Sequence, residues 1–128
     1  MRFAQIVSII FAAFLLPSVA FAHGDPPKAK HGGLMQESQE LWLELVVKDT
    51  EVRVYVLDDR QQPVAPAQVS GTATVLVSGK SYKVDLSPTA SDAEGVEGKL
   101  PVPSTGRLVA TVALKVGAKS ISARFMAP

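Results

Sequence analysis

Hydrophobic and polar residues alternate along most of the chain after residue 40. Leu41, Leu43 and Leu45 face one way in this pattern, while Trp42 and Glu44 face the other. Such alternation is typical of a β-strand with one buried face. No stretch after residue 22 carries a long helical apolar stripe, so the sequence predicts an all-β domain. Further alternating or Thr/Val-rich segments lie at 51–57, 71–77, 81–86, 107–116 and 120–125.

Short polar segments separate these strands. Residues 48–51 predict a hairpin connection, and 57–64 contains Asp and Pro residues that favour turns. Residues 88–98 predict a long loop with a short strand at its end. Six to eight short strands spaced in this way favour an immunoglobulin-like antiparallel β-sandwich, with a small barrel as the alternative. The Cys–Trp–Cys pattern of antibody domains is absent, so the strand topology stays open.

The first 22 residues predict a signal peptide. Arg2 supplies a positive start, an apolar run extends over 3–16, and Ala20-Phe21-Ala22 has the small-x-small form that signal peptidase cleaves. An uncleaved transmembrane anchor is the alternative, but the run is shorter than the roughly 20 apolar residues that a span needs. Cleavage falls after Ala22 or, as the second possibility, after Ala20. We therefore expect the mature chain to be exported to the periplasm.

Residues 23–39 predict a flexible arm ahead of a domain at 40–128. The segment up to residue 33 contains Pro26, Pro27 and three glycines and almost no apolar side chain. It buries too little surface to offset the entropy that is lost on ordering. We expect the arm to be mobile unless a metal ion or the surface of the domain holds it.

Charge balance and residue types exclude several classes of function. The chain has 13 Lys and Arg against 12 Asp and Glu, and loss of Arg2 with the leader makes the two equal. A balanced charge disfavours nucleic acid and anionic membranes as partners. Without cysteine, the chain has no disulfide, no thiolate metal site and no cysteine nucleophile. A catalytic triad needs a histidine on a scaffold, and 40–128 contains none, so we expect no enzyme.

His23 and His31 are the two histidines of the chain, and imidazole is the commonest metal ligand near neutral pH. If His23 is the first residue, its amine and Nδ1 chelate one metal, and His31 adds a third nitrogen in a histidine brace. If the chain starts at Phe21, the amine, two amides and the His23 imidazole form a square plane. Copper(II) favours both arrangements because it prefers tetragonal nitrogen ligands. The alternative is that both histidines are solvated tail residues.

Met35 joins the two histidines as a candidate ligand, and Trp42 and Glu44 are weaker candidates for the same site. Met35 offers a thioether that could bind copper(I) together with His31. The indole of Trp42 could cover that ion through a cation–π contact. Glu44 could offer a carboxylate to a divalent ion. Packing on the sheet explains Met35 and Trp42 as well, and a solvated strand face is the alternative for Glu44.

Several short motifs resemble those of a known family. They are His31-Gly32-Gly33, Glu-Leu-Trp-Leu-Glu-Leu-Val at 40–46, Val-Tyr-Val-Leu-Asp at 54–58, Gln-Pro-Val at 62–64 and Ala-Arg-Phe at 123–125. Together they resemble small exported proteins of Gram-negative bacteria that accompany copper and heavy-metal efflux or resistance systems. The resemblance implies a β-domain that handles metal, with efflux components as partners. Trp42 stands where members often carry a histidine, and Gln62 stands where Gly is usual, which puts the family's own metal site in doubt in this chain.

The sequence thus predicts a periplasmic metal-binding protein that buffers or delivers copper in metal resistance or efflux. The alternative is a metal-free β-sandwich that serves as an interaction module of an exported complex. A copper oxidase built on a histidine brace is a third, disfavoured class, because such enzymes are generally larger and carry a flat substrate face.

Overall fold

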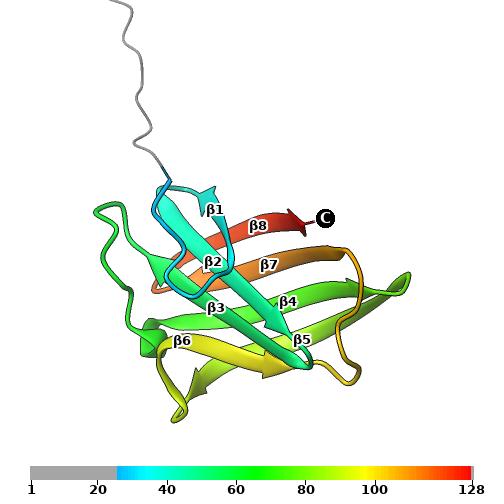
Figure 1. The fold of residues 1–128 in the computed structure, drawn as a ribbon. Coiled ribbons are helices and arrows are strands. Elements are labelled where there is room, and N and C mark those ends of the chain that lie inside the picture. Colours follow the sequence, from blue (N-terminus) through cyan, green and yellow to red (C-terminus); the bar gives the residue numbers. More distant parts are fainter. Residues whose placement is uncertain (1–25, 128) are drawn as a thin grey trace, which may run out of the picture.

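The computed structural model describes residues 26–127, so the expected signal peptide at 1–22 and His23 lie outside the described residues. This part of the chain contains antiparallel strands and one turn of 3-10 helix (Figure 1), which confirms the all-β prediction. No helix within 26–127 is long and apolar enough to cross a membrane. The elements are β1 (Leu34–Ser38), β2 (Leu41–Lys48), β3 (Glu51–Leu57), η1 (Pro66–Gln68), β4 (Val69–Val77), β5 (Lys80–Thr89), β6 (Asp92–Lys99), β7 (Leu108–Val116) and β8 (Lys119–Ala127).

The strands form one curled sheet in the order β1-β2-β3-β6-β5-β4-β7-β8. Its two ends meet where the turn before β2 bonds to the start of β8. Gln39 Nε2 donates to the carbonyl of Ser120 at 3.3 Å, and Lys119 Nζ donates to the carbonyl of Gln39 at 3.2 Å. Figure 1 shows β1 and β8 side by side at this closure. The sheet is therefore barrel-like, which is compatible with both the small sandwich and the small barrel that the sequence predicts.

The apolar residues of the alternating pattern fill the space between the two halves of the curled sheet. In Figure 1, β2 and β3 cross in front of β4 and β7, and side chains from both pairs belong to one core cluster. Burial of each Leu, Val or Phe side chain contributes about 1.5–3 kcal/mol relative to its exposure. The largest fully buried side chains are Phe125, Leu43, Leu45, Val52, Val54, Val75, Val96 and Val112.

Two segments differ from the strand boundaries that the pattern predicts. Leu34–Ser38, expected in the arm, forms β1 and pairs along β2. Asp92–Lys99, expected mostly as loop, forms β6 and joins β3 to β5. The apolar signal of β6 is weak because glycine replaces larger residues at crowded positions. A Cβ at Gly95 would lie 2.8 Å from the ring of Tyr55, so this glycine makes room for its neighbour and does not interrupt the strand.

Candidate functional site

The outer face of β2 and β3 carries a cluster of polar and aromatic side chains. Glu44 on β2 lies directly opposite Tyr55 on β3 and opposite Met35 on β1. The sequence neighbours of Glu44, which are Leu43 and Leu45, belong to the core. Because side chains alternate along a strand, Glu44 and Tyr55 project from the opposite, outer face.

The arm reaches this face through a turn at His31-Gly32-Gly33. Gly32 has a φ of +71°, a left-handed conformation that glycine adopts without steric cost. Gly33 lies against β2, where a Cβ would collide with the backbone carbonyl of Leu45. The two glycines therefore let the chain turn and approach the sheet closely, which brings His31 beside Glu44.

Glu44 is a buried carboxylate whose partners all come from the arm. Its side chain is 5 % exposed. Oε2 accepts the backbone N–H groups of His31 and Gly33, both at 2.9 Å, and Oε1 lies 2.9 Å from Nδ1 of His31. An ionised carboxylate only accepts, so Nδ1 carries a proton in this contact. The expected solvated strand face is wrong at Glu44, because the arm covers it and replaces water with three donors.

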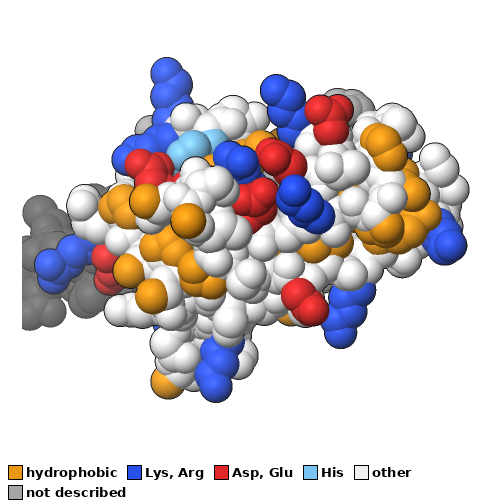
Figure 2. All heavy atoms as spheres, turned by 90° about the horizontal axis from the view of Figure 1, so that it is seen from below, with side chains coloured by type: hydrophobic (Ala, Val, Ile, Leu, Met, Phe, Trp, Pro, Cys, Tyr) orange, Lys and Arg blue, Asp and Glu red, His pale blue; other side chains and the backbone are white. Residues whose placement is uncertain are grey.

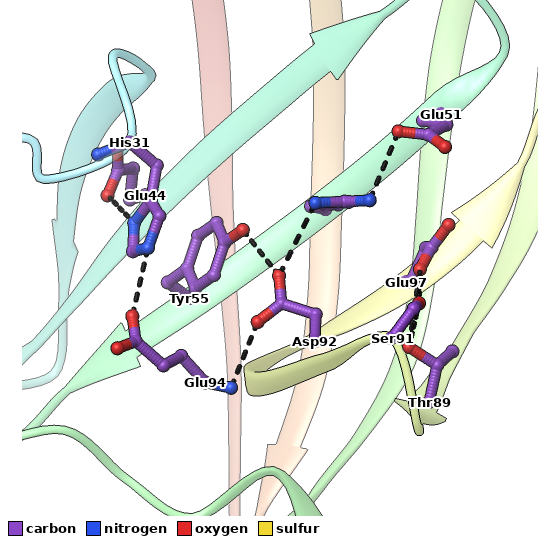
Figure 3. Close-up of polar contacts among 10 residues, drawn as sticks. His31, Glu44, Glu51, Tyr55, Thr89, Ser91, Asp92, Glu94 and Glu97 are labelled. Carbon is purple, nitrogen blue, oxygen red and sulfur yellow. Dashed lines mark hydrogen bonds and ion pairs between the residues drawn. The ribbon is translucent and has the colours of Figure 1, made fainter.

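His31 is fixed by contacts on three sides (Figure 3). Its ring lies flat against that of Tyr55, with centroids 3.6 Å apart and planes inclined by 3°. Nδ1 bonds to Glu44, and Nε2 lies 2.9 Å from Oε2 of Glu94 on β6. Each ring nitrogen thus faces a carboxylate oxygen at hydrogen-bond distance. The arm is therefore docked on the domain at His31, which corrects the reading of this histidine as a solvated tail residue.

Tyr55 also connects His31 to the start of β6, the strand that carries Glu94. The hydroxyl of Tyr55 donates to Oδ2 of Asp92 at 2.6 Å, and the backbone N–H of Glu94 donates to Oδ1 of Asp92 at 3.0 Å (Figure 3). Burial raises the pKa of Tyr55 to about 12, and its hydrogen bond to Asp92 adds to the rise. The hydrogen bond from Tyr55, followed by that from the Glu94 amide, lowers the pKa of Asp92. Arg53 forms ion pairs on the other side of Asp92. Its Nη1 lies 3.6 Å from Oδ2 of Asp92, and its Nη2 lies 3.2 Å from Oε2 of Glu51.

The candidate ligand Met35 and the weaker candidate Trp42 lie at different positions relative to this cluster. Met35 is half-buried and lines a small hollow together with His31 and Glu44. Trp42 is half-buried two positions before Glu44 on β2, and it is not among the residues that line this hollow. The described residues therefore bring Met35 to His31 and leave the indole of Trp42 outside the hollow.

The described residues supply part of a metal-binding set. Within 26–127, no three side chains of His, Cys, Asp or Glu are grouped so that they could hold a metal ion. Nδ1 of His31 and both oxygens of Glu44 already bond to each other or to the arm backbone. Nε2 of His31 and the carboxylate of Glu94, which is 64 % exposed, are the donors that border on solvent. A metal ion at His31 would therefore need ligands beyond the groups of side chains that the described residues bring together.

Sequence reasoning missed Tyr55, Asp92 and Glu94 as members of the cluster. Glu94 is 63 positions away from His31, and the pairing of β6 with β3 brings it near. No local motif marks such a contact. Tyr55 gave a faint signal, because a large aromatic residue at an outward position of an alternating strand indicates that something covers it.

The sequence matches no protein-family model, no curated protein and no solved structure. Figure 2 shows the histidine atoms at the surface, with acidic and basic side chains beside them. The His31 side chain is 28 % exposed, so solvent reaches its ring. The Glu44 side chain, which contacts Nδ1, is only 5 % exposed.

Proposed function

We propose that this chain is an exported, periplasmic protein that binds copper at its N-terminal arm and buffers or delivers the ion in metal resistance or efflux. One observation carries the proposal. The buried Glu44 holds Nδ1 of His31, while Nε2 faces the exposed and movable carboxylate of Glu94. The imidazole thus has one anchored nitrogen and one exchangeable nitrogen.

The different surroundings of the two ring nitrogens suit a metal ligand. Histidines that bind metals commonly donate their second ring N–H to a carboxylate, which fixes the tautomer and orients the free nitrogen. Glu44 occupies that supporting position and is itself held by two backbone amides. The stack on Tyr55 fixes the plane of the ring. Little side-chain entropy is left to lose when Nε2 of His31 exchanges its proton for a cation.

The remaining ligands would come from the processed N terminus. As first residue, His23 offers an amine and a ring nitrogen, and the glycine and prolines between it and His31 allow the chain to fold back. Copper(II) leads the affinity order of the divalent first-row metals and prefers tetragonal nitrogen ligands. Met35, in the hollow beside His31, offers a softer donor to copper(I). The resemblance to metal-resistance proteins supports the same choice of metal.

A second candidate function follows from the same contacts. Both ring nitrogens of His31 already have carboxylate partners, so the arm is docked without any metal. In this alternative, His31-Gly32-Gly33 closes the arm onto the sheet and the domain acts as an interaction module of an exported complex. The two functions differ in whether copper competes for Nε2.

The deciding experiment is a copper(II) titration of the protein purified after export with its own N-terminal segment. Competition with a chromophoric chelator gives the affinity, and mass spectrometry gives the first residue and the metal stoichiometry. We expect one copper ion per chain at micromolar affinity or tighter, and a large loss in the double variant His23→Ala, His31→Ala. Circular dichroism checks that the variant keeps its strands. Equal affinity of parent and variant contradicts the metal function and favours the interaction module.

A further inference from the structure

We infer that Glu94 is a second protein ligand of the cation, so that metal binding ties the N-terminal arm to strand β6. The inference rests on the proposed function, because it concerns the same ion at His31. It adds a ligand that lies outside the arm and that no sequence motif marks.

The two carboxylates beside His31 have different roles. Glu44 accepts three hydrogen bonds and is 5 % exposed, so coordinating a metal would cost it the contacts that dock the arm. Within residues 26–127, the Glu94 carboxylate makes one polar contact, to Nε2, and its side chain is 64 % exposed. Exposed ion pairs of this kind contribute little to stability, so little is lost when this contact is rearranged. Glu94 is therefore the carboxylate that can move into the coordination sphere.

The contact between the two side chains places the Glu94 carboxylate directly beside the exchangeable nitrogen of His31. Nε2 of His31 and Oε2 of Glu94 are 2.9 Å apart. This is an ordinary hydrogen-bond distance, with Oε2 in the direction that a cation on Nε2 would occupy, so the carboxylate has to shift to bind the same ion. The cation takes the place of the proton on Nε2, that proton leaves to solvent, and the Glu94 carboxylate swings aside to the adjacent position. A right angle between ligands is the geometry that copper(II) prefers.

Tyr55 and Asp92 fix the position of the Glu94 backbone. Asp92 accepts the hydroxyl of Tyr55 on one oxygen and the backbone N–H of Glu94 on the other. The same Tyr55 ring supports the imidazole of His31. One aromatic side chain thus positions both donors, which come from parts of the chain distant in sequence (Figure 3). We assign Tyr55 as a positioning residue of this site.

The test compares copper(II) affinity in four proteins: the parent, Glu94→Gln, His31→Ala and the control Glu37→Gln. Glu37 is an exposed carboxylate on β1, so its variant makes the same chemical change away from the His31 ring. We expect Glu94→Gln to lower the copper affinity about tenfold or more. Loss of a residue that only hydrogen-bonds to a ligand already lowers metal affinity by about that factor. We also expect it to shift the copper EPR spectrum, because a carboxylate ligand would be replaced by an amide. The Glu37→Gln protein should match the parent in both measurements.

The outcomes separate this inference from the proposed function. If Glu94→Gln binds copper like the parent, with an unchanged EPR spectrum, while His31→Ala loses binding, Glu94 is no ligand and the metal function stands. If His31→Ala and Glu94→Gln both bind like the parent, the ion does not use the docked imidazole, and the inference fails together with the His31 site of the proposed function. A loss in Glu37→Gln equal to that in Glu94→Gln points to general electrostatic attraction and overturns the assignment of Glu94 as a ligand.

Discussion

The imidazole of His31 lies parallel to the phenol ring of Tyr55, with centroids 3.6 Å apart and an angle of 3° between the planes. His31 comes from the polar arm, and Tyr55 comes from the middle of β3. The stack therefore joins a segment with little apolar surface to the folded sheet. It also leaves the Tyr55 hydroxyl pointing along the sheet to Asp92, so that one residue belongs to two contacts.

The hydroxyl of Tyr55 contributes to stability separately from its ring. Tyr55→Phe keeps the stack on His31 but leaves Asp92, whose side chain is 13 % exposed, without its shortest hydrogen bond. We expect the free energy of unfolding to fall by about 1–3 kcal/mol, since a hydrogen bond to a charged group is lost. Urea unfolding measures the change. A double-mutant cycle with Asp92→Asn should show coupling, and strictly additive effects of the two substitutions would contradict this role.

The metal-free protein should lose stability between pH 10 and 12. Burial raises the pKa of Tyr55 from 10 to about 12, so the folded state keeps its phenol proton where the unfolded chain has lost it. The contribution is complete below pH 10 and is lost as the pH rises toward 12, at up to about 1.4 kcal/mol per pH unit. His31, Asp92 and Arg53 are the charged or titratable groups around the ring. Unfolding free energy measured against pH checks this, and Tyr55→Phe should flatten the curve in that window.

The opposite sign applies to Asp92 at low pH. Its pKa is lowered by the hydrogen bond from Tyr55 and then by that from the Glu94 amide. The folded state therefore holds the ionised form, and this contribution is present above the ordinary pKa of an aspartate. It is lost as the pH falls through the lowered value. Acid unfolding of Asp92→Asn should show a shallower pH dependence than that of the parent, and an unchanged profile would contradict the assignment.

The alternating pattern was sufficient for most of the fold and for little of the site. Leu43 and Leu45 mark β2 as a half-buried strand because their burial depends on a local period of two. Strand β6 was harder to find, since Gly95 serves packing against Tyr55 and contributes no apolar signal. His31 was recognised as a candidate ligand from its residue type. Its partner Glu94 could not be, because that contact depends on which strands pair.

Gly32 and Gly33 have a different structural role from the one that their sequence context predicts. The sequence presents these glycines as part of a flexible arm that is poor in apolar residues. In the structure they are the positions where the backbone turns and touches the sheet, which docks the arm. The composition predicts a mobile arm because the segment has few apolar side chains to bury. In the structure, hydrogen bonds to the buried carboxylate of Glu44 hold the segment in place.

Glu44 and Glu94 should differ sharply in their effect on stability. Glu44→Gln replaces a buried carboxylate that accepts three hydrogen bonds, so we expect a loss of about 1–3 kcal/mol. Glu94→Gln alters an exposed contact and should cost less than about 1 kcal/mol. Urea unfolding in the presence of a metal chelator measures both. Hydrogen exchange at the amides of His31 and Gly33 should speed up in Glu44→Gln alone, and equal effects of the two variants would contradict the division of roles.

Substitution of Gly33 should undock the arm while leaving the sheet intact. In Gly33→Ala, the new Cβ runs into the Leu45 carbonyl and Glu44, so the amide of residue 33 can no longer reach Oε2. We expect His31 to leave Tyr55, the arm to become sensitive to protease, and the copper affinity to fall because Nε2 is no longer fixed. Gly117→Ala is the matched control for the glycine change, since Gly117 has a φ of +59° and no atom near its missing Cβ. The control carries only the backbone strain of about 1 kcal/mol. Limited proteolysis with mass mapping of the cut sites distinguishes the two variants, and a Gly33→Ala arm that stays as protected as the parent's would contradict the docking role of this glycine.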